Sequence, residues 1–218
     1  NDIGGGFTVS GRYTVYGNGF TLNYTGNGQY LNNGLKQGVV TVSENGTLDN
    51  LRIKASIYPK AYLYYGHSVL GDYVQGGPSS VEGDKTRYHY QLSAVVAKGN
   101  ATISNCYIYG GRNNIFVDTG DVIITDTVLE CGVATNVQIQ SNSSHTVTFN
   151  NVTTIQHQVN ATIGDTTKVM LGAGVLVGPE TNNNPKIVLK GEFKQYNWVN
   201  AKDKDAVSGS AEKTIINA

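Results

Sequence analysis

The clearest pattern in the sequence is a short register of apolar and polar positions that returns along the chain. In each copy an apolar residue stands two positions before an Asn or Asp, and an aliphatic residue lies three positions after it. The copies are Leu48-Asp-Asn50-Leu51-Arg-Ile53, Ile103-Ser-Asn105-Cys106-Tyr-Ile108 and Ile124-Thr-Asp126-Thr127-Val-Leu129, with a partial copy at Phe149-Asn-Asn151-Val152. The Asn or Asp positions are 55, 21 and 25 residues apart. Apolar segments 169–171 and 187–189 are candidates for later copies that lack the Asn.

A period slightly above 20 residues predicts one coil of a solenoid in which short strands are separated by bends. Such coils stack about 4.8 Å apart, so each strand bonds the coil above and the coil below. At a sharp bend Asn tolerates the unusual backbone angles, and its amide reaches the amide one coil away. The alternative is an antiparallel β-sandwich, which gives no reason for Asn to recur once per coil.

Short β-branched segments bounded by Gly, Asn or Asp predict strands rather than helices. They are 39–42, 94–97, 115–117, 122–125, 137–139 and 147–149. A helical period is suggested only in the last dozen residues, around 201–216. The sequence therefore predicts an all-β protein.

Two longer segments carry a family resemblance. "ATISNCYIYGGRNNIFVDTGDVIITDTVLECG" (101–132) resembles the right-handed parallel β-helix repeats of pectin-lyase-like proteins, in which an asparagine ladder lines one bend. "YTVYGNGFTLNYTG" (13–26) resembles the opening coil of such domains. The resemblance is good over 94–156, looser over 7–57 and weak after 160. It implies a right-handed parallel β-helix of about eight coils over residues 1–200, with a C-terminal cap or linker at 201–218.

A Tyr-rich insertion at 57–92 interrupts the register and holds seven of the 14 tyrosines. Inserted loops of solenoids gather on one face, frequently the binding face. Tyrosine rings stack on the apolar faces of sugars while their hydroxyls bond sugar hydroxyls. The candidate ligand-binding residues are Tyr62, Tyr64, Tyr65, Tyr88 and Tyr90. The alternative is that these tyrosines alternate along strands and pack a minor sheet against the solenoid.

The fold's relatives include polygalacturonases and pectate lyases, so their catalytic patterns have to be sought. The triplet Arg52-Ile53-Lys54 precedes Gly66-His67-Ser68, which reverses the hydrolases' order and lacks their final glycine. We expect instead that Arg52 and Lys54 point outward while Ile53 fills the core. No catalytic residue is assigned.

Metal and thiol chemistry give weak candidates. Pectate lyases bind calcium through several Asp, and the nearest counterpart here is Asp118, Asp121 and Asp126. The simpler interpretation is that Asp118 and Asp121 bond their own turn and that Asp126 belongs to the ladder. We expect no cofactor. Cys106 occupies an inward position and predicts a buried apolar residue, while a disulfide with Cys131 is left open.

The charge balance and the lengths of the apolar runs exclude some classes of function. The 218 residues carry 16 Lys+Arg and 16 Asp+Glu, and this balance excludes the electrostatic footprint of a nucleic-acid binder. The apolar run 169–178 is about half of a membrane span, so no membrane insertion is expected. The chain begins without an apolar leader, as expected of a processed protein or a piece of a longer one.

Low charge and the Asn-, Thr-, Gly- and Tyr-rich composition favour an extracellular or cell-surface location. We expect a non-catalytic module that binds a polysaccharide or glycan surface, or that forms a structural segment of an adhesin, surface layer or filament and self-associates. The alternative is a polysaccharide lyase or glycoside hydrolase that uses Asp118, Asp121 and Asp126.

Overall fold

The computed structural model is built from β-strands. The described residues are 2–3, 6–24, 38–55, 93–111, 113–130, 132, 135–140, 145–157, 159–163, 166–170, 173–177, 185–199 and 210–217. Every regular element in these ranges is a strand, as the sequence predicts. Within the same ranges, no helix is long and apolar enough to cross a membrane.

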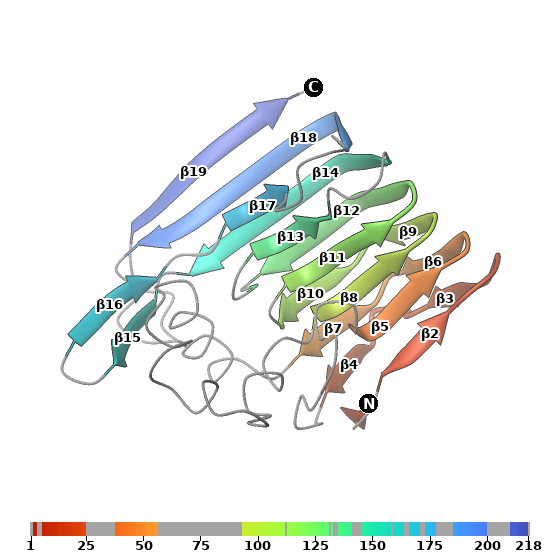
Figure 1. Cartoon of the computed structure of the whole chain (residues 1–218), viewed down its shortest axis with the longest axis horizontal. Helices are drawn as coiled ribbons and strands as arrows, with labels where there is room; N and C mark the ends of the chain where they lie inside the picture. The colour runs from red at the N-terminus through yellow and green to blue at the C-terminus, as the bar shows by residue number, and fades with distance from the viewer. Residues whose placement is uncertain are drawn as a thin grey trace.

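The strands form two parallel sheets and one small hairpin (Figure 1). The smaller sheet contains β2 (Phe7–Val9), β5 (Gly38–Ser43), β8 (Ser93–Lys98), β11 (Asn113–Thr119), β13 (Thr135–Ile139) and β17 (Ala173–Val177). The larger sheet contains β1 (Asp2–Ile3), β3 (Thr14–Tyr16), β4 (Thr21–Tyr24), β6 (Gly46–Asp49), β7 (Arg52–Ala55), β9 (Ala101–Ser104), β10 (Tyr107–Gly110), β12 (Val122–Glu130), β14 (Thr146–His157), β18 (Lys186–Val199) and β19 (Ser210–Asn217). The hairpin pairs β15 (Val159–Ile163) with β16 (Thr166–Met170).

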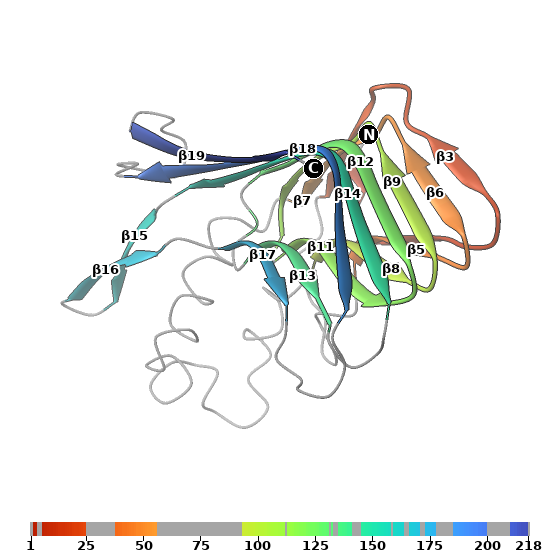
Figure 2. The ribbon, with the colours of Figure 1, turned by 90° about the horizontal axis from the view of Figure 1, so that it is seen from above.

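The chain passes repeatedly through both sheets in the same order. One passage, here termed a lap, runs along a strand of the smaller sheet, turns a corner, and crosses the larger sheet around a second bend (Figure 2). The laps start at β2, β5, β8, β11, β13 and β17, the six strands of the smaller sheet. Each is paired in parallel with the next, which excludes the antiparallel sandwich. The described residues thus contain six laps, and the expected count of eight coils is not confirmed.

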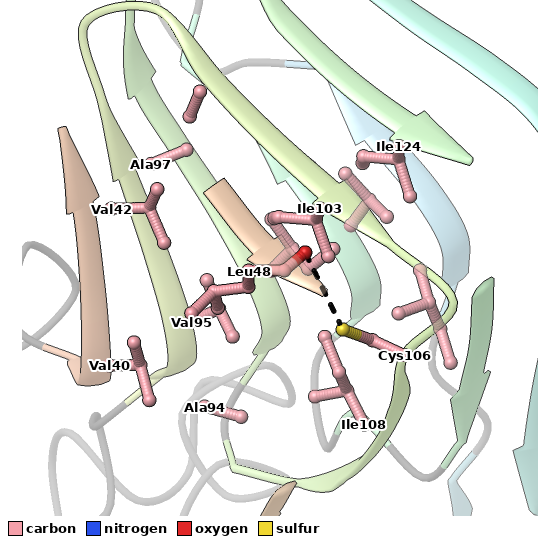
Figure 3. Close-up of a cluster of buried hydrophobic side chains, with 14 of the residues drawn as sticks. Val40, Val42, Leu48, Ala94, Val95, Ala97, Ile103, Cys106, Ile108 and Ile124 are labelled. Atoms are coloured by element: carbon pink, nitrogen blue, oxygen red, sulfur yellow. Dashed lines mark hydrogen bonds between the residues drawn. The ribbon is translucent and has the colours of Figure 1, made fainter. Parts of the chain in front are cut away.

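Aliphatic side chains from both sheets fill the space between them (Figure 3). Leu48, Ile103, Ile124 and Phe149 are register partners on successive laps and are at most 1 % exposed. The first three are the leading apolar positions of the repeat. The hydrophobic pattern that recurs in the sequence is therefore a column of core residues, each stacked on the residue one lap before.

The two sheets differ in what they present to solvent. The inner strands β8, β11 and β13 of the smaller sheet are buried on both faces: in β8, Val95 points into the core, yet its neighbour Val96 is also fully buried. The larger sheet alternates, with Arg52 and Lys54 exposed on either side of the buried Ile53, as predicted. Continuous apolar strands are typical of two-sided burial, and alternating strands of one-sided burial. The larger sheet thus supplies the protein's open face.

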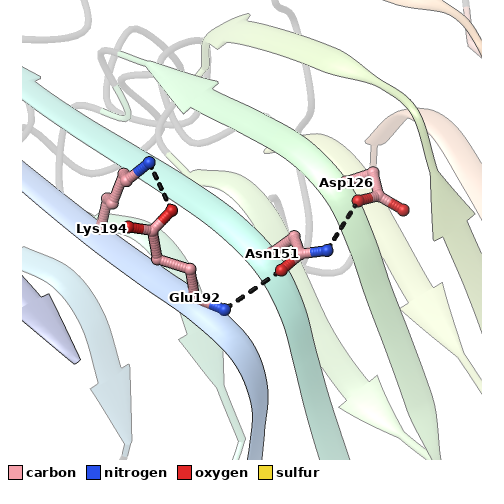
Figure 4. A network of polar contacts seen from close by, with 4 residues as sticks. All are labelled: Asp126, Asn151, Glu192 and Lys194. Atoms are coloured by element: carbon pink, nitrogen blue, oxygen red, sulfur yellow. Dashed lines mark hydrogen bonds and ion pairs between the residues drawn. The ribbon is translucent and has the colours of Figure 1, made fainter. Parts of the chain in front are cut away.

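The bend within the larger sheet, here the middle corner, contains the predicted column of Asn and Asp. Asn50, Asn105, Asp126 and Asn151 each follow register-paired residues, and all have φ between 47° and 54°. Asn151 Nδ2 donates to Asp126 Oδ1 at 3.1 Å, and the Glu192 backbone N–H donates to Asn151 Oδ1 at 3.1 Å (Figure 4). The column is confirmed, and its side chains link one lap to the next.

The last rung of this column is a glycine. Gly191 follows Lys190, the register partner of Asn150, and has φ of +65°. A Cβ at this position would lie 2.3 Å from Asn151 Oδ1. Because the space excludes a side chain and Gly readily adopts this backbone angle, Gly takes the place of Asn where the backbone of Glu192 completes the ladder.

Two more corners carry their own Asn and Asp contacts, which the repeat analysis missed. At the first corner, between the smaller and larger sheets, Asn100 Nδ2 donates to Asn45 Oδ1 at 3.2 Å. The Asp121 N–H donates to Asn100 Oδ1 at 3.0 Å, and the Thr146 N–H donates to Asp121 Oδ1 at 2.6 Å. The expectation that Asp121 bonds its own turn is therefore wrong, because its carboxylate bonds the next lap.

At the third corner, where the chain returns to the smaller sheet, the amides are fully buried. Asn114 Nδ2 donates to the carbonyls of Gly110 and Glu130, each at 2.9 Å. Asn136 Nδ2 donates to the Ile155 carbonyl at 3.3 Å. Because Glu130 and Ile155 are register partners, the amides of Asn114 and Asn136 make equivalent hydrogen bonds on successive laps. Buried backbone carbonyls at a sharp bend need such partners.

Two sequence expectations fail in the later part of the chain. Val169 and Met170 lie in β16, which pairs antiparallel with β15 instead of continuing the stack. Residues 210–217, which overlap the segment 201–216 that suggested a helix, form β19, and every residue of β19 pairs antiparallel with β18. Segment 187–189, in contrast, stacks on 147–149 as predicted. Residues 201–209 and the insertion 57–92 lie outside the described residues.

Hydrogen bonds between laps make Asp49 a pH-sensitive contact. Asp49 Oδ1 accepts from Ser104 Oγ at 2.6 Å and from Asn105 Nδ2 at 2.8 Å. These bonds, that of Ser104 first, lower the pKa of the Asp49 carboxyl below its ordinary value of 3.8. A lowered folded-state pKa adds stability that is present above the unfolded-state pKa and is lost as the pH falls through the folded one.

We therefore expect the free energy of unfolding to decline below about pH 4, and to decline less steeply in Asp49→Asn. Urea unfolding of both proteins between pH 2 and pH 7 measures this difference. Parallel pH profiles for the two proteins would show that the Asp49 contact is not coupled to folding.

Candidate functional site

The open face of the larger sheet, beyond the middle corner, gathers aromatic and charged side chains. They alternate with core residues along the strands, as Tyr107 and Tyr109 do on either side of the buried Ile108. Parallel register then lines them up in two columns, here termed the platform. One column is Thr21, Arg52, Tyr107, Val128, Thr153 and Lys194, and the other is Asn23, Lys54, Tyr109, Glu130, Ile155 and Tyr196.

The platform side chains are regularly spaced because they follow the parallel register of the strands. Neighbouring laps lie about 4.8 Å apart and alternate residues of a strand roughly 7 Å apart, so six laps extend over about 24 Å. Arg52 and Lys54 are exposed, and the two tyrosines one lap away are half-buried. In Figure 2 this part of the larger sheet, with β7, β14 and β18, forms the upper layer of the molecule.

One hydrogen bond fixes the centre of the platform. The Tyr107 hydroxyl donates to Glu130 Oε2 at 2.6 Å, across one lap and one column. A charge-assisted bond of this length holds both side chains in place. Glu130 is also the one carboxylate among the twelve platform residues named above. The platform thus presents an anchored aromatic ring beside a carboxylate that is already engaged.

Two cationic side chains of the platform, Arg52 and Lys54, lie one lap before Tyr107 and Tyr109. Among the residues that the structure describes, no carboxylate forms an ion pair with Arg52 or Lys54, whereas Lys194 pairs with Glu192. A guanidinium and an ammonium beside aromatic rings suit a ligand that carries carboxylates and apolar ring faces.

The three predicted calcium ligands have different structural surroundings. Asp118 is buried on β11, Asp121 bonds Thr146 at the first corner, and Asp126 bonds Asn151 at the middle corner. No group of three or more His, Cys, Asp or Glu side chains that could hold a metal ion occurs in the described ranges. The structure does not bring these three carboxylates together as a site.

The remaining predictions concern the five tyrosines of the insertion and Cys106. Tyr62, Tyr64, Tyr65, Tyr88 and Tyr90 lie outside the described residues, so the glycan site in the insertion stays a prediction. Cys106 is a free thiol and is buried, as predicted. Burial raises the pKa of the Cys106 thiol to about 11, which keeps it protonated and unreactive near neutral pH.

The platform itself was not found from the sequence. The sequence pattern predicts that Arg52 and Lys54 point outward, but it does not by itself place Tyr107 and Tyr109 beside them. The signal was present, because Arg52-Ile-Lys54 and Tyr107-Ile-Tyr109 occupy the same positions of the repeat. The outward positions of the four successive copies correspond to the four central pairs of the two columns, which are 52/54, 107/109, 128/130 and 153/155.

Comparisons with known proteins assign no family: no family model, curated protein or solved structure matches this chain. The fold is therefore assigned from the structure alone. It is an all-β fold with parallel sheets, compatible with a parallel β-helix.

Proposed function

We propose that this chain is a right-handed parallel β-helix module of a secreted or cell-surface protein, of the kind found in pectin-lyase-like proteins, and that it binds an acidic polysaccharide without cleaving it. The observation that carries the proposal is the platform, in which two cations of one lap, which form no ion pair among the described residues, lie directly beside the two tyrosines of the next lap.

The chemistry of the platform favours acidic sugars over neutral ones. Tyr107 and Tyr109 are aromatic side chains of the type that stacks on pyranose rings. Arg52 and Lys54 stand one lap from these rings in the same two columns, where they would meet the carboxylates of a sugar stacked on the tyrosines.

Binding without cleavage is supported by the state of the platform's carboxylate. Glycoside hydrolysis by the usual route needs two carboxyl groups on either side of the scissile bond. The platform offers Glu130, whose Oε2 already accepts the Tyr107 hydroxyl. The hydrolase alternative therefore gains no support from the platform residues.

Calorimetric titration with soluble oligogalacturonate tests this function. We expect Tyr109→Ala to weaken binding by about tenfold, since a stacked aromatic contributes roughly 1 kcal/mol beyond its buried area. The double variant Arg52→Ala, Lys54→Ala should lose as much affinity, and added salt should weaken binding to the unmodified chain more than to this variant.

Matched controls separate this site from the rest of the surface. Thr47→Ala and Tyr16→Ala alter a half-buried and an exposed position of the larger sheet outside the platform and should leave the affinity unchanged. Methyl-esterified oligogalacturonate, which lacks the charge, should bind more weakly than the acid form. Equal affinity of all variants, or the appearance of unsaturated products or new reducing ends, would contradict the proposal.

A further inference from the structure

The charge of the platform changes along the stack rather than within a lap. The two outward positions of β7 are both cations, Arg52 and Lys54, and their register partners on β10 are both aromatic, Tyr107 and Tyr109. A polymer laid along one strand would therefore meet one kind of side chain, whereas a polymer laid along the stack meets each kind in turn. This order gives the platform a direction.

The two laps after the tyrosines continue the change. On β12 the positions of the two tyrosines are taken by Val128 and Glu130, both of which are half-buried. The outward pair of β14, Thr153 and Ile155, is uncharged. From β7 to β14 the laps thus offer two cations, two aromatic rings, one carboxylate and then no charge.

The hydrogen bond between Tyr107 and Glu130 determines where this carboxylate lies. The Tyr107 hydroxyl donates to Glu130 Oε2 at 2.6 Å, so the carboxylate of β12 is held toward the aromatic lap of β10. Glu130 therefore has two effects on the platform. Its oxygen positions the ring of Tyr107, and it places a negative charge beside that ring.

A polyuronate laid along the stack would meet this charge. Laps repeat roughly every 4.8 Å, which is close to the length that one pyranose unit adds to a polysaccharide. When one uronate stacks on the tyrosines with its carboxylate at the cations of β7, the following units lie over β12 and β14. In any orientation, further uronates at these two places bring a carboxylate within about one lap of Glu130, where like charges repel.

We propose that Glu130 is the specificity-determining residue of the platform, and that it selects a glycan with one uronate followed by uncharged sugars over a continuous polyuronate. This inference rests on the proposed function and narrows its ligand class. Val128 and Ile155 offer apolar surface to the uncharged units. Sugar hydroxyls can donate to the Glu130 carboxylate, whereas an ionised carboxylate has no donor to offer.

Calorimetric titration with two tetrasaccharides tests the selectivity. Aldotetraouronic acid contains one glucuronate linked to three uncharged xylose units, and tetragalacturonate contains four uronates. We expect the unmodified chain to bind aldotetraouronic acid more tightly at low ionic strength. Attraction to Arg52 and Lys54 alone would give the opposite order, because tetragalacturonate carries the higher charge.

Glu130→Gln keeps an oxygen that can accept the Tyr107 hydroxyl and removes the charge. It should tighten the binding of tetragalacturonate about two- to fivefold, the effect of one charge pair at a solvent-exposed site, and change the affinity for aldotetraouronic acid less. The matched control is Glu44→Gln at the first corner, where Glu44 Oε2 accepts from Ser10 Oγ at 2.7 Å. It removes the same charge outside the platform and should leave the ratio of the two affinities unchanged.

The outcomes separate this inference from the proposed function. Tighter or equal binding of tetragalacturonate by the unmodified chain, or a ratio that Glu130→Gln does not change, would overturn the role of Glu130 while the binding of acidic glycans still holds. Failure of both tetrasaccharides to bind would overturn the proposed function as well. Circular dichroism verifies that each variant is folded, and the order of affinities in the unmodified chain depends on no variant.

Discussion

Ile124→Ala should lower the free energy of unfolding by about 2–5 kcal/mol, the cost of emptying a fully buried aliphatic position. Ile124 is 0 % exposed and lies in the central core column between Ile103 and Phe149. Neighbouring laps are held by backbone ladders on both sides, so the walls cannot collapse easily into the space left by the side chain. Chemical denaturation of the purified chain measures the change.

The adjacent residue provides the control. Ile123 is on the same strand but points outward and is 46 % exposed, so Ile123→Ala should cost less than about 1 kcal/mol. The difference between the two variants depends only on which face each side chain occupies. Equal losses would mean that the register of β12 is not the one described.

Asn114→Asp should destabilise the chain by about 3 kcal/mol or more. The Asn114 amide is fully buried and donates to two backbone carbonyls, those of Gly110 and Glu130. A carboxylate of the same shape cannot donate to either. The substitution therefore strands two buried acceptors and buries a charge, and each stranded group costs roughly 1–3 kcal/mol.

The same substitution at the first corner should be nearly neutral. Asn45 is exposed, and its Oδ1 accepts a hydrogen bond from Asn100, which a carboxylate can also accept. We expect Asn45→Asp to change the free energy of unfolding by less than about 0.5 kcal/mol. If both variants unfold at the same denaturant concentration, the third corner does not depend on its buried amide.

The sequence predicted the stacked laps because their signal is periodic and local. An Asn or Asp at a left-handed bend, followed three residues later by a core aliphatic, recurs on successive laps at Asn50, Asn105 and Asp126. The inward positions of Cys106 and Ile53 followed from the same register. A constraint that repeats with every lap is visible in one sequence.

What the sequence did not predict depends on partners that no local pattern identifies. Asp121 sits beside a turn glycine, so a bond to its own turn was the simple interpretation, yet the next lap brings Thr146 within 2.6 Å. Asn114 and Asn136 form only two rungs and adjoin other polar residues, which hides their recurrence. Segment 210–217 forms a strand because the open edge of β18 offers it backbone partners, which outweighs local helical spacing.

Cross-linking across neighbouring laps tests the central claim, that residues one lap apart are stacked in register. Thr47 and Thr102 are register partners on the outer face of the larger sheet although 55 residues separate them. The experiment uses a Cys131→Ser background, in which the remaining native thiol, Cys106, is buried and protonated. In this background the double variant Thr47→Cys, Thr102→Cys should form a disulfide on mild oxidation. The control double variant Thr47→Cys, Thr148→Cys should not, because these two positions lie in the same column but three laps apart, at about 14 Å. Failure of the first pair to link, or equal linking of both pairs, would contradict the stack of parallel laps.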